Sequence, residues 1–131
     1  MKPARLVVYV CFLKDATADV IPKMVHELMR LRVCESTDGH LVRLPELPGS
    51  LLIVPQATLG GRSKAGRLQY HGNACRAEAE ALFAAFAEQC GVALQEKSAP
   101  DSGSVVLHGT YGSRQMLELE SDGPGTSLLE F

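Results

Sequence analysis

Two uninterrupted apolar runs of strand length stand out along the chain. Leu6–Leu13 and Leu51–Val54 lack the alternation of polar and apolar residues that marks a half-buried strand. The first run is rich in β-branched residues, and we expect it to form a central strand covered on both faces. Each run ends early, at Lys14 and at Pro55, well short of the ~20 apolar residues of a membrane-spanning helix. The pattern therefore excludes a membrane protein.

Two other segments have the spacing of helices. Apolar residues between Ile21 and Leu28 recur at positions i, i+3, i+4 and i+7, with Asp19 before them as a cap. This stripe is expected to pack on the sheet. A second helix is predicted from just after Asn73 to about Gln89, with Gly91 as its left-handed stop. Its apolar face would consist of Ala79, Leu82, Phe83 and Phe86.

The remaining apolar stretches are short and predict strands. Asp38-Gly39 tolerates the positive φ angles of a tight turn, so a hairpin is predicted between Arg32–Glu35 and Leu41–Leu44. Further strands are expected at Val92–Glu96, Val105–His108, Gln115–Glu120 and Thr126–Phe131. These elements predict an α/β fold, a layered sandwich of mixed β-sheets with two helices, in a single domain that spans residues 1–131.

The composition indicates a cellular compartment and gives no sign of a metal site. The chain has 131 residues, and 46% of them are hydrophobic. This is enough for a hydrophobic core that needs no disulfide bonds. Its four cysteines form no Cys-x-x-Cys pair and have no zinc-like spacing to the four histidines. We therefore expect reduced, ordinarily buried thiols, a cytoplasmic location, and neither metal nor cofactor.

Positive charge is concentrated in one segment. No Asp or Glu lies from Leu47 to Ala77, although the chain as a whole has a net charge of −2. An acidic protein with one basic segment attracts a polyanion at one place, and the interspersed glycines let a backbone approach phosphates closely. The alternative is a solvated, flexible loop. The cations of the segment are Arg62, Lys64, Arg67 and Arg76.

Two motifs resemble those of the D-aminoacyl-tRNA deacylase family. Pro55–Gly61 reads Pro-Gln-Ala-Thr-Leu-Gly-Gly after a buried strand, and Ser121–Thr126 reads Ser-Asp-Gly-Pro-Gly-Thr. The similarity extends from Leu6 to Phe131 and includes Gly109–Gln115. Strict D-specific members read Ser-Gln-Phe-Thr-Leu at the first motif, so this chain looks more like the animal paralogue with relaxed chirality.

The resemblance also has departures. Family members usually begin with an extra strand hairpin before the strand equivalent to Leu6–Leu13, so we expect that this hairpin is absent here. The paralogue has a larger residue where this chain has Gly125 and a histidine where it has Ser127. These differences bear on which amino acid is accepted more than on the reaction. The Gly-Pro bond is cis in the strict enzymes and trans in the relaxed ones, and the first motif favours trans at Gly123–Pro124.

The resemblance implies hydrolysis of the ester between an amino acid and the terminal ribose of tRNA. The substrate would be D-aminoacyl-tRNA, L-Ala mischarged on threonine tRNA, or both. The implied partners are the acceptor end of aminoacyl-tRNA and a second copy of the chain in a homodimer, without membrane or DNA.

The residues themselves leave two schemes for the chemistry. Neither motif holds a Ser-His-Asp or Cys-His set, and no carboxylate adjoins Thr58 in sequence, so a Thr58 nucleophile lacks an evident base. In the second scheme, backbone N–H groups stabilise the oxyanion while the substrate's 2′-hydroxyl orients a water. The catalytic residues are then Gln56, Ala57 and Thr58.

The other expected site residues fall into two groups, and two alternative functions stay open. The substrate pocket would contain Pro55, Leu59, Gly123, Pro124, Gly125 and Thr126. The tRNA-binding residues would be Arg62, Lys64, Arg67, Tyr70, His71 and Arg114. One alternative is a non-catalytic tRNA-binding module. The other is a thiol hydrolase that uses His71 with Cys75 or Cys90.

Overall fold

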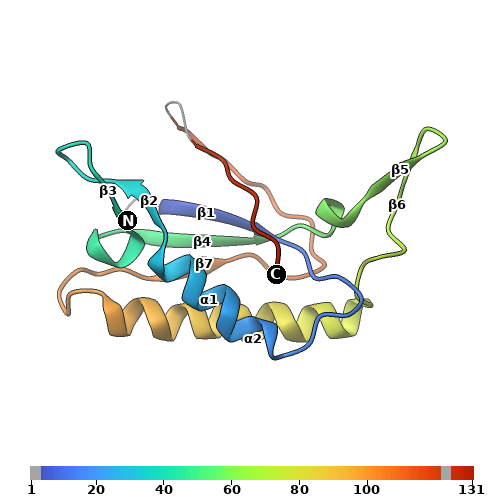
Figure 1. The fold of residues 1–131 in the computed structure, drawn as a ribbon, viewed down its shortest axis with the longest axis horizontal. Coiled ribbons are helices and arrows are strands. Elements are labelled where there is room, and N and C mark those ends of the chain that lie inside the picture. The colour runs from blue at the N-terminus through green and yellow to red at the C-terminus, as the bar shows by residue number, and fades with distance from the viewer. Residues whose placement is uncertain (1–3, 122–124) are drawn as a thin grey trace.

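A three-stranded parallel sheet forms the centre of the structure, a computed structural model that describes residues 4–121 and 125–131. Its strand order is β1 (Ala4–Val10), β4 (Ser50–Pro55), β7 (Val106–His108). Helices α1 (Val20–Arg30) and α2 (Arg76–Lys97) lie side by side across one face of this sheet (Figure 1). The predicted fold class is confirmed: strands and two helices form an α/β structure in layers.

The centre of the sheet is β4, not β1. Leu51 and Ile53 in β4 have no exposed surface, and both neighbouring strands are hydrogen-bonded to β4. The expectation of a central strand at Leu6–Leu13 is therefore wrong. In the described residues β1 has one partner strand and ends at Val10, and Tyr9 is 43% exposed. An apolar run shows that a strand is partly covered, but it does not say how many neighbours the strand has.

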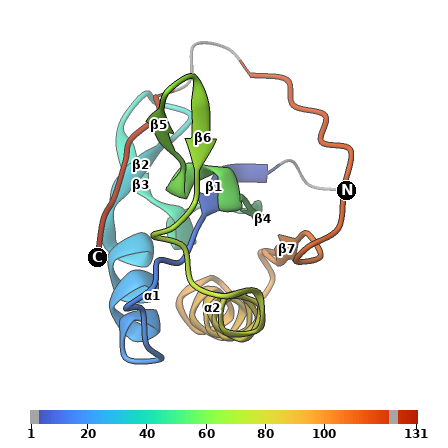
Figure 2. The same cartoon turned by 90° about the vertical axis from the view of Figure 1, so that its right-hand side faces the viewer.

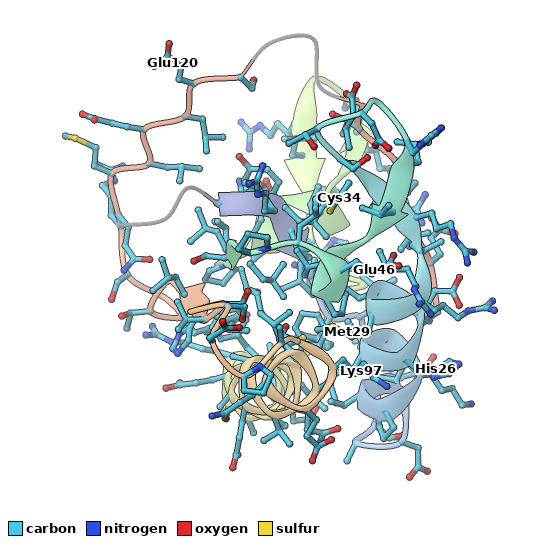
Figure 3. All side chains as sticks on the ribbon, turned by 90° about the vertical axis from the view of Figure 1, so that its left-hand side faces the viewer. His26, Met29, Cys34, Glu46, Lys97 and Glu120 are labelled. Carbon is cyan, nitrogen blue, oxygen red and sulfur yellow. The ribbon has the colours of Figure 1, made fainter. Side chains whose placement is uncertain are left out.

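Helix α1 forms as the apolar stripe predicts. Ile21, Val25 and Leu28 are buried, together with Met29, which lies between the two helices (Figure 3). Asp19 occupies the N-cap position, but its side chain makes no capping bond because its backbone is already helical, with φ −65° and ψ −21°. Among the described residues, no helix combines the length and the apolar character needed to cross a bilayer.

Helix α2 continues past its predicted end. The expected stop at Gly91 and the expected strand Val92–Glu96 are both wrong, since helix extends to Lys97. Leu94 lies one turn beyond Cys90 on the buried face and is 1% exposed. Burying a leucine is worth about 1.5–3 kcal/mol, which exceeds the ~1 kcal/mol cost of a glycine inside a helix.

Two antiparallel hairpins extend from this core. The predicted one is confirmed as β2 (Arg32–Glu35) and β3 (Leu41–Arg43), with Gly39 at φ +83° in the turn and the short helix η1 (Leu44–Glu46) after it. The other, β5 (Arg62–Lys64) and β6 (Arg67–Gln69), lies in the basic segment, where a loop is the sequence-based expectation. Ala65 and Gly66 form its two-residue turn, both with positive φ.

The C-terminal part of the chain is extended but makes no sheet. The predicted strands Gln115–Glu120 and Thr126–Phe131 are wrong for the described residues, because no neighbouring strand pairs with either segment. Figure 2 shows these segments standing away from the sheet. Met116 and Leu128 are 90% and 78% exposed, so an apolar pattern without a hydrogen-bonding partner does not produce a strand here.

Candidate functional site

The first motif forms a tight turn at the end of the central strand. Gln56 N–H donates to the Val10 carbonyl at 2.9 Å, which extends the β1–β4 pairing by one bond beyond Pro55. The short 3₁₀ helix η2 (Ala57–Gly60) follows directly. Leu59 N–H donates to the Gln56 carbonyl, and Gly61 N–H donates to the Thr58 carbonyl, both at 3.1 Å. The turn is therefore held to the sheet at one end and closed by its own bonds.

Two N–H groups of this turn are available to a ligand. Within the described residues, no acceptor pairs with the N–H of Ala57 or of Thr58, as the first turn of a helix requires. Both residues are exposed. The Gln56 N–H, in contrast, is occupied by Val10. The turn therefore presents two adjacent backbone donors of the kind that stabilise an oxyanion.

The Thr58 side chain has a donor, not a base, as its neighbour. Gln56 Nε2 donates to Thr58 Oγ1 at 2.8 Å. Among the described residues, no carboxylate, imidazole or thiol is hydrogen-bonded to this hydroxyl. An amide cannot take a proton from the hydroxyl, so the arrangement gives Thr58 no activation as a nucleophile.

A hollow of about 380 Å³ adjoins the turn. The Gly109–Gln115 segment forms one wall, where Thr110 N–H donates to Gln115 Oε1 at 2.9 Å and Tyr111 packs on Phe83 with ring centroids 5.9 Å apart. The start of α2 forms the other. The lining residues are Pro55, Ala57, Asn73, Ala74, Arg76, Tyr111, Gly112 and Ser113.

Six of these lining residues were not among the predicted site residues: Asn73, Ala74, Arg76, Tyr111, Gly112 and Ser113. The side-chain contacts of two of them, Asn73 and Arg76, bear on the geometry of the site. Asn73 reaches back to the turn, where its Nδ2 donates to the Ala57 carbonyl at 2.9 Å. Arg76 is the first residue of α2, and its guanidinium lies against Gly112. Arg76 has a weak signal in the sequence, since it belongs to the basic segment. Asn73 has no such signal, because an asparagine in a turn before a helix gives no indication that its side chain contacts a residue sixteen positions earlier.

The β5–β6 hairpin gathers its cations on one face. Residues paired across an antiparallel ladder point to the same side, and neighbours along a strand alternate. Arg62 pairs with Gln69, and Lys64 pairs with Arg67, so the three cations share a face with Gln69. Ser63 and Leu68 lie on the other face. All three cations are exposed, and the hairpin projects beyond the sheet (Figure 1).

The other residues assigned to tRNA are arranged less closely. Tyr70 packs on Gly61, where an added Cβ would lie 3.0 Å from its ring. His71 is exposed beside it, and Arg114 is exposed in the segment after the Tyr111 loop. Within the described residues, none of the three is recorded in an ion pair.

The described part of the second motif does not line the hollow. Gly123 and Pro124, and with them the isomer of their peptide bond, lie outside the described residues. Gly125 and Thr126 are described and exposed, and no atom of the described residues other than its chain neighbours lies within 4 Å of a Cβ built on Gly125. Leu59 is 54% exposed and is not among the residues that line the hollow.

The thiols do not form a reactive site. Cys90 has no exposed surface, and burial raises its pKa to about 12. Cys75 is exposed before α2, and no hydrogen bond joins it to His71 in the described residues. No group of three His, Cys, Asp or Glu side chains among the described residues could hold a metal ion. These facts leave the backbone turn as the centre of the candidate site.

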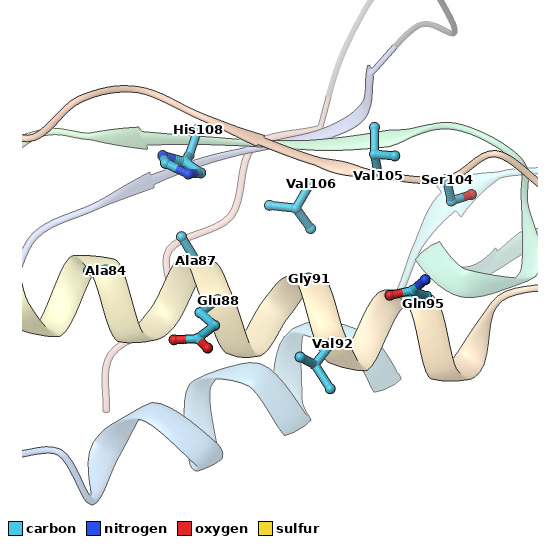
Figure 4. A pocket seen from close by; sticks show the side chains of 10 residues that line it. All are labelled: Ala84, Ala87, Glu88, Gly91, Val92, Gln95, Ser104, Val105, Val106 and His108. Atoms are coloured by element: carbon cyan, nitrogen blue, oxygen red, sulfur yellow. The ribbon is translucent and has the colours of Figure 1, made fainter.

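A second hollow of about 530 Å³ lies between α2 and β7 (Figure 4). Most of its walls are alanine, valine and glycine, with Glu88, Gln95 and His108 as the larger polar side chains. No described residue of either motif lines it. Ser104 and His108 both line it, but Ser104 Oγ is hydrogen-bonded to the Leu47 carbonyl and His108 Nδ1 to the Gly109 carbonyl, and no hydrogen bond joins the two side chains in the described residues. The turn after β4 is therefore kept as the candidate site.

Comparisons with known proteins show the family of the chain. The family described as D-Tyr-tRNA(Tyr) deacylase matches residues 4–130. The chain is 47% identical over 126 residues to D-aminoacyl-tRNA deacylase 2 of Danio rerio, covering 96% of this chain and 79% of the relative. It is 46% identical over 128 residues to the protein of that name from Homo sapiens, covering 96% and 76%. A bacterial D-aminoacyl-tRNA deacylase, from Clostridioides difficile, is 34% identical, covering 88% and 72%.

Solved structures give the same result. A probable eukaryotic D-amino acid tRNA deacylase superposes with a TM-score of 0.76 at 27% identity, covering 90% of this chain and 80% of that one. The c-Myc DNA unwinding element binding protein superposes with a TM-score of 0.70 at 22% identity, covering 91% and 76%, and shows the fold alone. The resemblance found in the sequence is confirmed: the chain belongs to the D-Tyr-tRNA(Tyr) deacylase family.

Proposed function

We propose that this chain removes amino acids from wrongly charged tRNA by means of its backbone turn. Membership in the family makes the chain an aminoacyl-tRNA deacylase, a hydrolase of ester bonds, and its relatives are named for D-aminoacyl-tRNA. The proposal concerns the mechanism and the substrates. The observation that carries it is the pair of accessible, unpaired N–H groups at Ala57 and Thr58 beside a hollow, within the described residues.

In this mechanism the two N–H groups bind the carbonyl oxygen of the aminoacyl ester. The oxygen gains negative charge as water attacks, and fixed donors stabilise that charge without having to reorganise. The neighbouring 2′-hydroxyl of the terminal ribose orients the attacking water. Each donor of this kind is worth about 3–4 kcal/mol, so the turn can supply much of the rate without a reactive side chain.

Two substrates test whether the chain is a deacylase or a non-catalytic tRNA-binding module. We expect the pure protein to release the amino acid from D-Tyr-tRNA, from L-Ala mischarged on threonine tRNA, or from both, while leaving correctly charged L-Thr-tRNA intact. Release is measured from radiolabelled aminoacyl-tRNA against a no-enzyme control. Binding of tRNA without release from either substrate would contradict the proposal and favour the non-catalytic tRNA-binding module.

Thr58→Ala separates the two chemical schemes. We expect its kcat to stay within about threefold of the wild type, because the substitution keeps the Thr58 N–H and removes a hydroxyl that has no base. Single-turnover deacylation at saturating enzyme is the measurement, with Ser63→Ala on the hairpin as the control for loss of an exposed hydroxyl. A fall of several orders of magnitude would identify Thr58 as the nucleophile.

The pocket wall that the second motif would supply is completed, in this proposal, by a homodimer. Gly125 and Thr126 are exposed and do not line the hollow in one chain, and apolar side chains in the extended C-terminal segments are exposed. A second copy can bury those side chains and bring the motif to the hollow. Sedimentation that shows only monomer at concentrations where the enzyme is active would exclude this arrangement.

The cytoplasm is the compartment that we propose. All four cysteines are free in the structure, and thiols stay reduced there. Cell fractionation that places the protein inside an oxidising compartment would contradict this assignment.

A further inference from the structure

A side chain from another part of the chain holds the carbonyl oxygen of Ala57. Asn73 Nδ2 donates to this oxygen at 2.9 Å, although sixteen residues separate the two in sequence. The thiol of Cys11, the residue after β1, approaches the same oxygen at 3.6 Å. The carbonyl is therefore fixed by two segments outside the turn.

Asn73 itself has a well-defined place. Its N–H donates to the Tyr70 carbonyl at 3.0 Å, and it forms an antiparallel bridge with Leu13. Ala74 N–H donates to the Phe12 carbonyl at 3.0 Å, so the backbone on its other side is held as well. A Cβ on Gly60 would overlap the Asn73 carboxamide, which shows how closely this side chain packs on the turn.

The oxygen that Asn73 holds belongs to the same peptide unit as the Thr58 N–H. A peptide unit is planar, so the direction of its carbonyl fixes the opposite direction of its N–H. A hydrogen bond to the carbonyl also polarises the unit and strengthens the N–H as a donor. The Asn73 carboxamide therefore acts on one of the two proposed oxyanion donors without touching the substrate carbonyl.

We propose that Asn73 is a positioning residue for deacylation, which holds the Ala57 carbonyl and thereby orients the Thr58 N–H toward the oxyanion. This inference rests on the proposed backbone mechanism. It concerns kcat, because the orientation of this donor matters most when charge develops on the oxygen. Binding of tRNA by the basic hairpin is independent of it.

Asn73→Asp and Asn73→Ala test the proposal in steady-state deacylation. We expect each variant to lose about tenfold in kcat near neutral pH, with KM within about twofold of the wild type, as the loss of one hydrogen bond to the turn predicts. Gln95→Glu, which adds the same negative charge at an exposed position of α2, is the matched control and should leave both constants unchanged.

The pH profile separates positioning from a general structural role. The carboxylate that Asn73→Asp introduces only accepts hydrogen bonds while it is ionised, whereas its protonated form donates one to the Ala57 carbonyl. The ratio of variant to wild-type kcat should therefore rise for Asn73→Asp as the pH falls from about 7 to about 4, toward the ordinary pKa of an aspartate. The ratio for Asn73→Ala should stay flat. Equal losses in both variants at every pH would overturn the proposal, and so would kcat values within twofold of the wild type.

A second readout does not depend on activity. The ¹⁵N shift of the Thr58 amide in the free protein reports the hydrogen bond to the Ala57 carbonyl. It should move in Asn73→Asp and Asn73→Ala but not in Gln95→Glu. An unmoved resonance in the two Asn73 variants would overturn the positioning role. A wild-type protein without deacylase activity would instead contradict the proposed function, so the two failures are distinguishable.

Discussion

Replacing Ala57 by proline is expected to lower kcat for deacylation by about 10²–10³-fold, the effect of deleting one oxyanion donor. Proline removes the Ala57 N–H and closes the side chain on the nitrogen in a ring. Ala57 is the first residue of η2, a position where proline fits a helix because its ring already has the required φ. The preceding residue, Gln56, has φ −140° and ψ 79°, outside the α region that a following proline disfavours. The loss should therefore be chemical and not conformational.

The control for this experiment is Ala57→Gly, which also changes the side chain at this position but keeps the N–H. We expect it to retain kcat within about threefold. KM for aminoacyl-tRNA should be similar in both variants, since the proposed phosphate contacts lie on the β5–β6 hairpin. An Ala57→Pro enzyme that is folded and as active as Ala57→Gly would show that the Ala57 N–H does not bind the oxyanion.

The fold was predictable where one stretch of sequence contains the whole signal. Asp38-Gly39 specifies the turn of the β2–β3 hairpin, and the apolar stripe of α1 specifies the buried face of that helix. The helix end predicted at Gly91 was wrong because the cost of a glycine inside a helix is smaller than the free energy gained by burying Leu94 a turn later. The strand predicted at Gln115–Glu120 was wrong because a strand also needs a hydrogen-bonding partner, and an apolar pattern does not specify one.

For the candidate site too, only the part encoded in one stretch of sequence could be predicted. The motif locates the turn, because Pro55 ends a recognisable buried strand. Which N–H groups of that turn are free depends on the β1–β4 register, which places the Val10 carbonyl on Gln56. The contact of Asn73 with Ala57 depends on how the segment before α2 returns to the sheet. Both are tertiary facts, so sequence patterns could name the motif but not its working donors.

Removing the cations of the β5–β6 hairpin is expected to weaken tRNA binding by about 30–100-fold at physiological salt. The change is the triple variant Arg62→Ala, Lys64→Ala, Arg67→Ala, whose side chains share one exposed face. Each phosphate contact releases counterions, so the slope of log K against log salt should fall by about two to three. Measuring tRNA affinity at several salt concentrations gives both quantities.

The same variant should leave the chemistry intact, since the hairpin contributes no group to the turn. We expect KM to rise and kcat at saturating aminoacyl-tRNA to stay near the wild-type value, the opposite of the result for Ala57→Pro. The matched control removes three exposed cations elsewhere, Lys23, Arg32 and Lys97, and lowers the net charge equally. Equal losses of affinity in the two triple variants would show that tRNA responds to overall charge and not to this face. A larger loss for the hairpin variant, with a smaller salt slope, would place the phosphates on Arg62, Lys64 and Arg67.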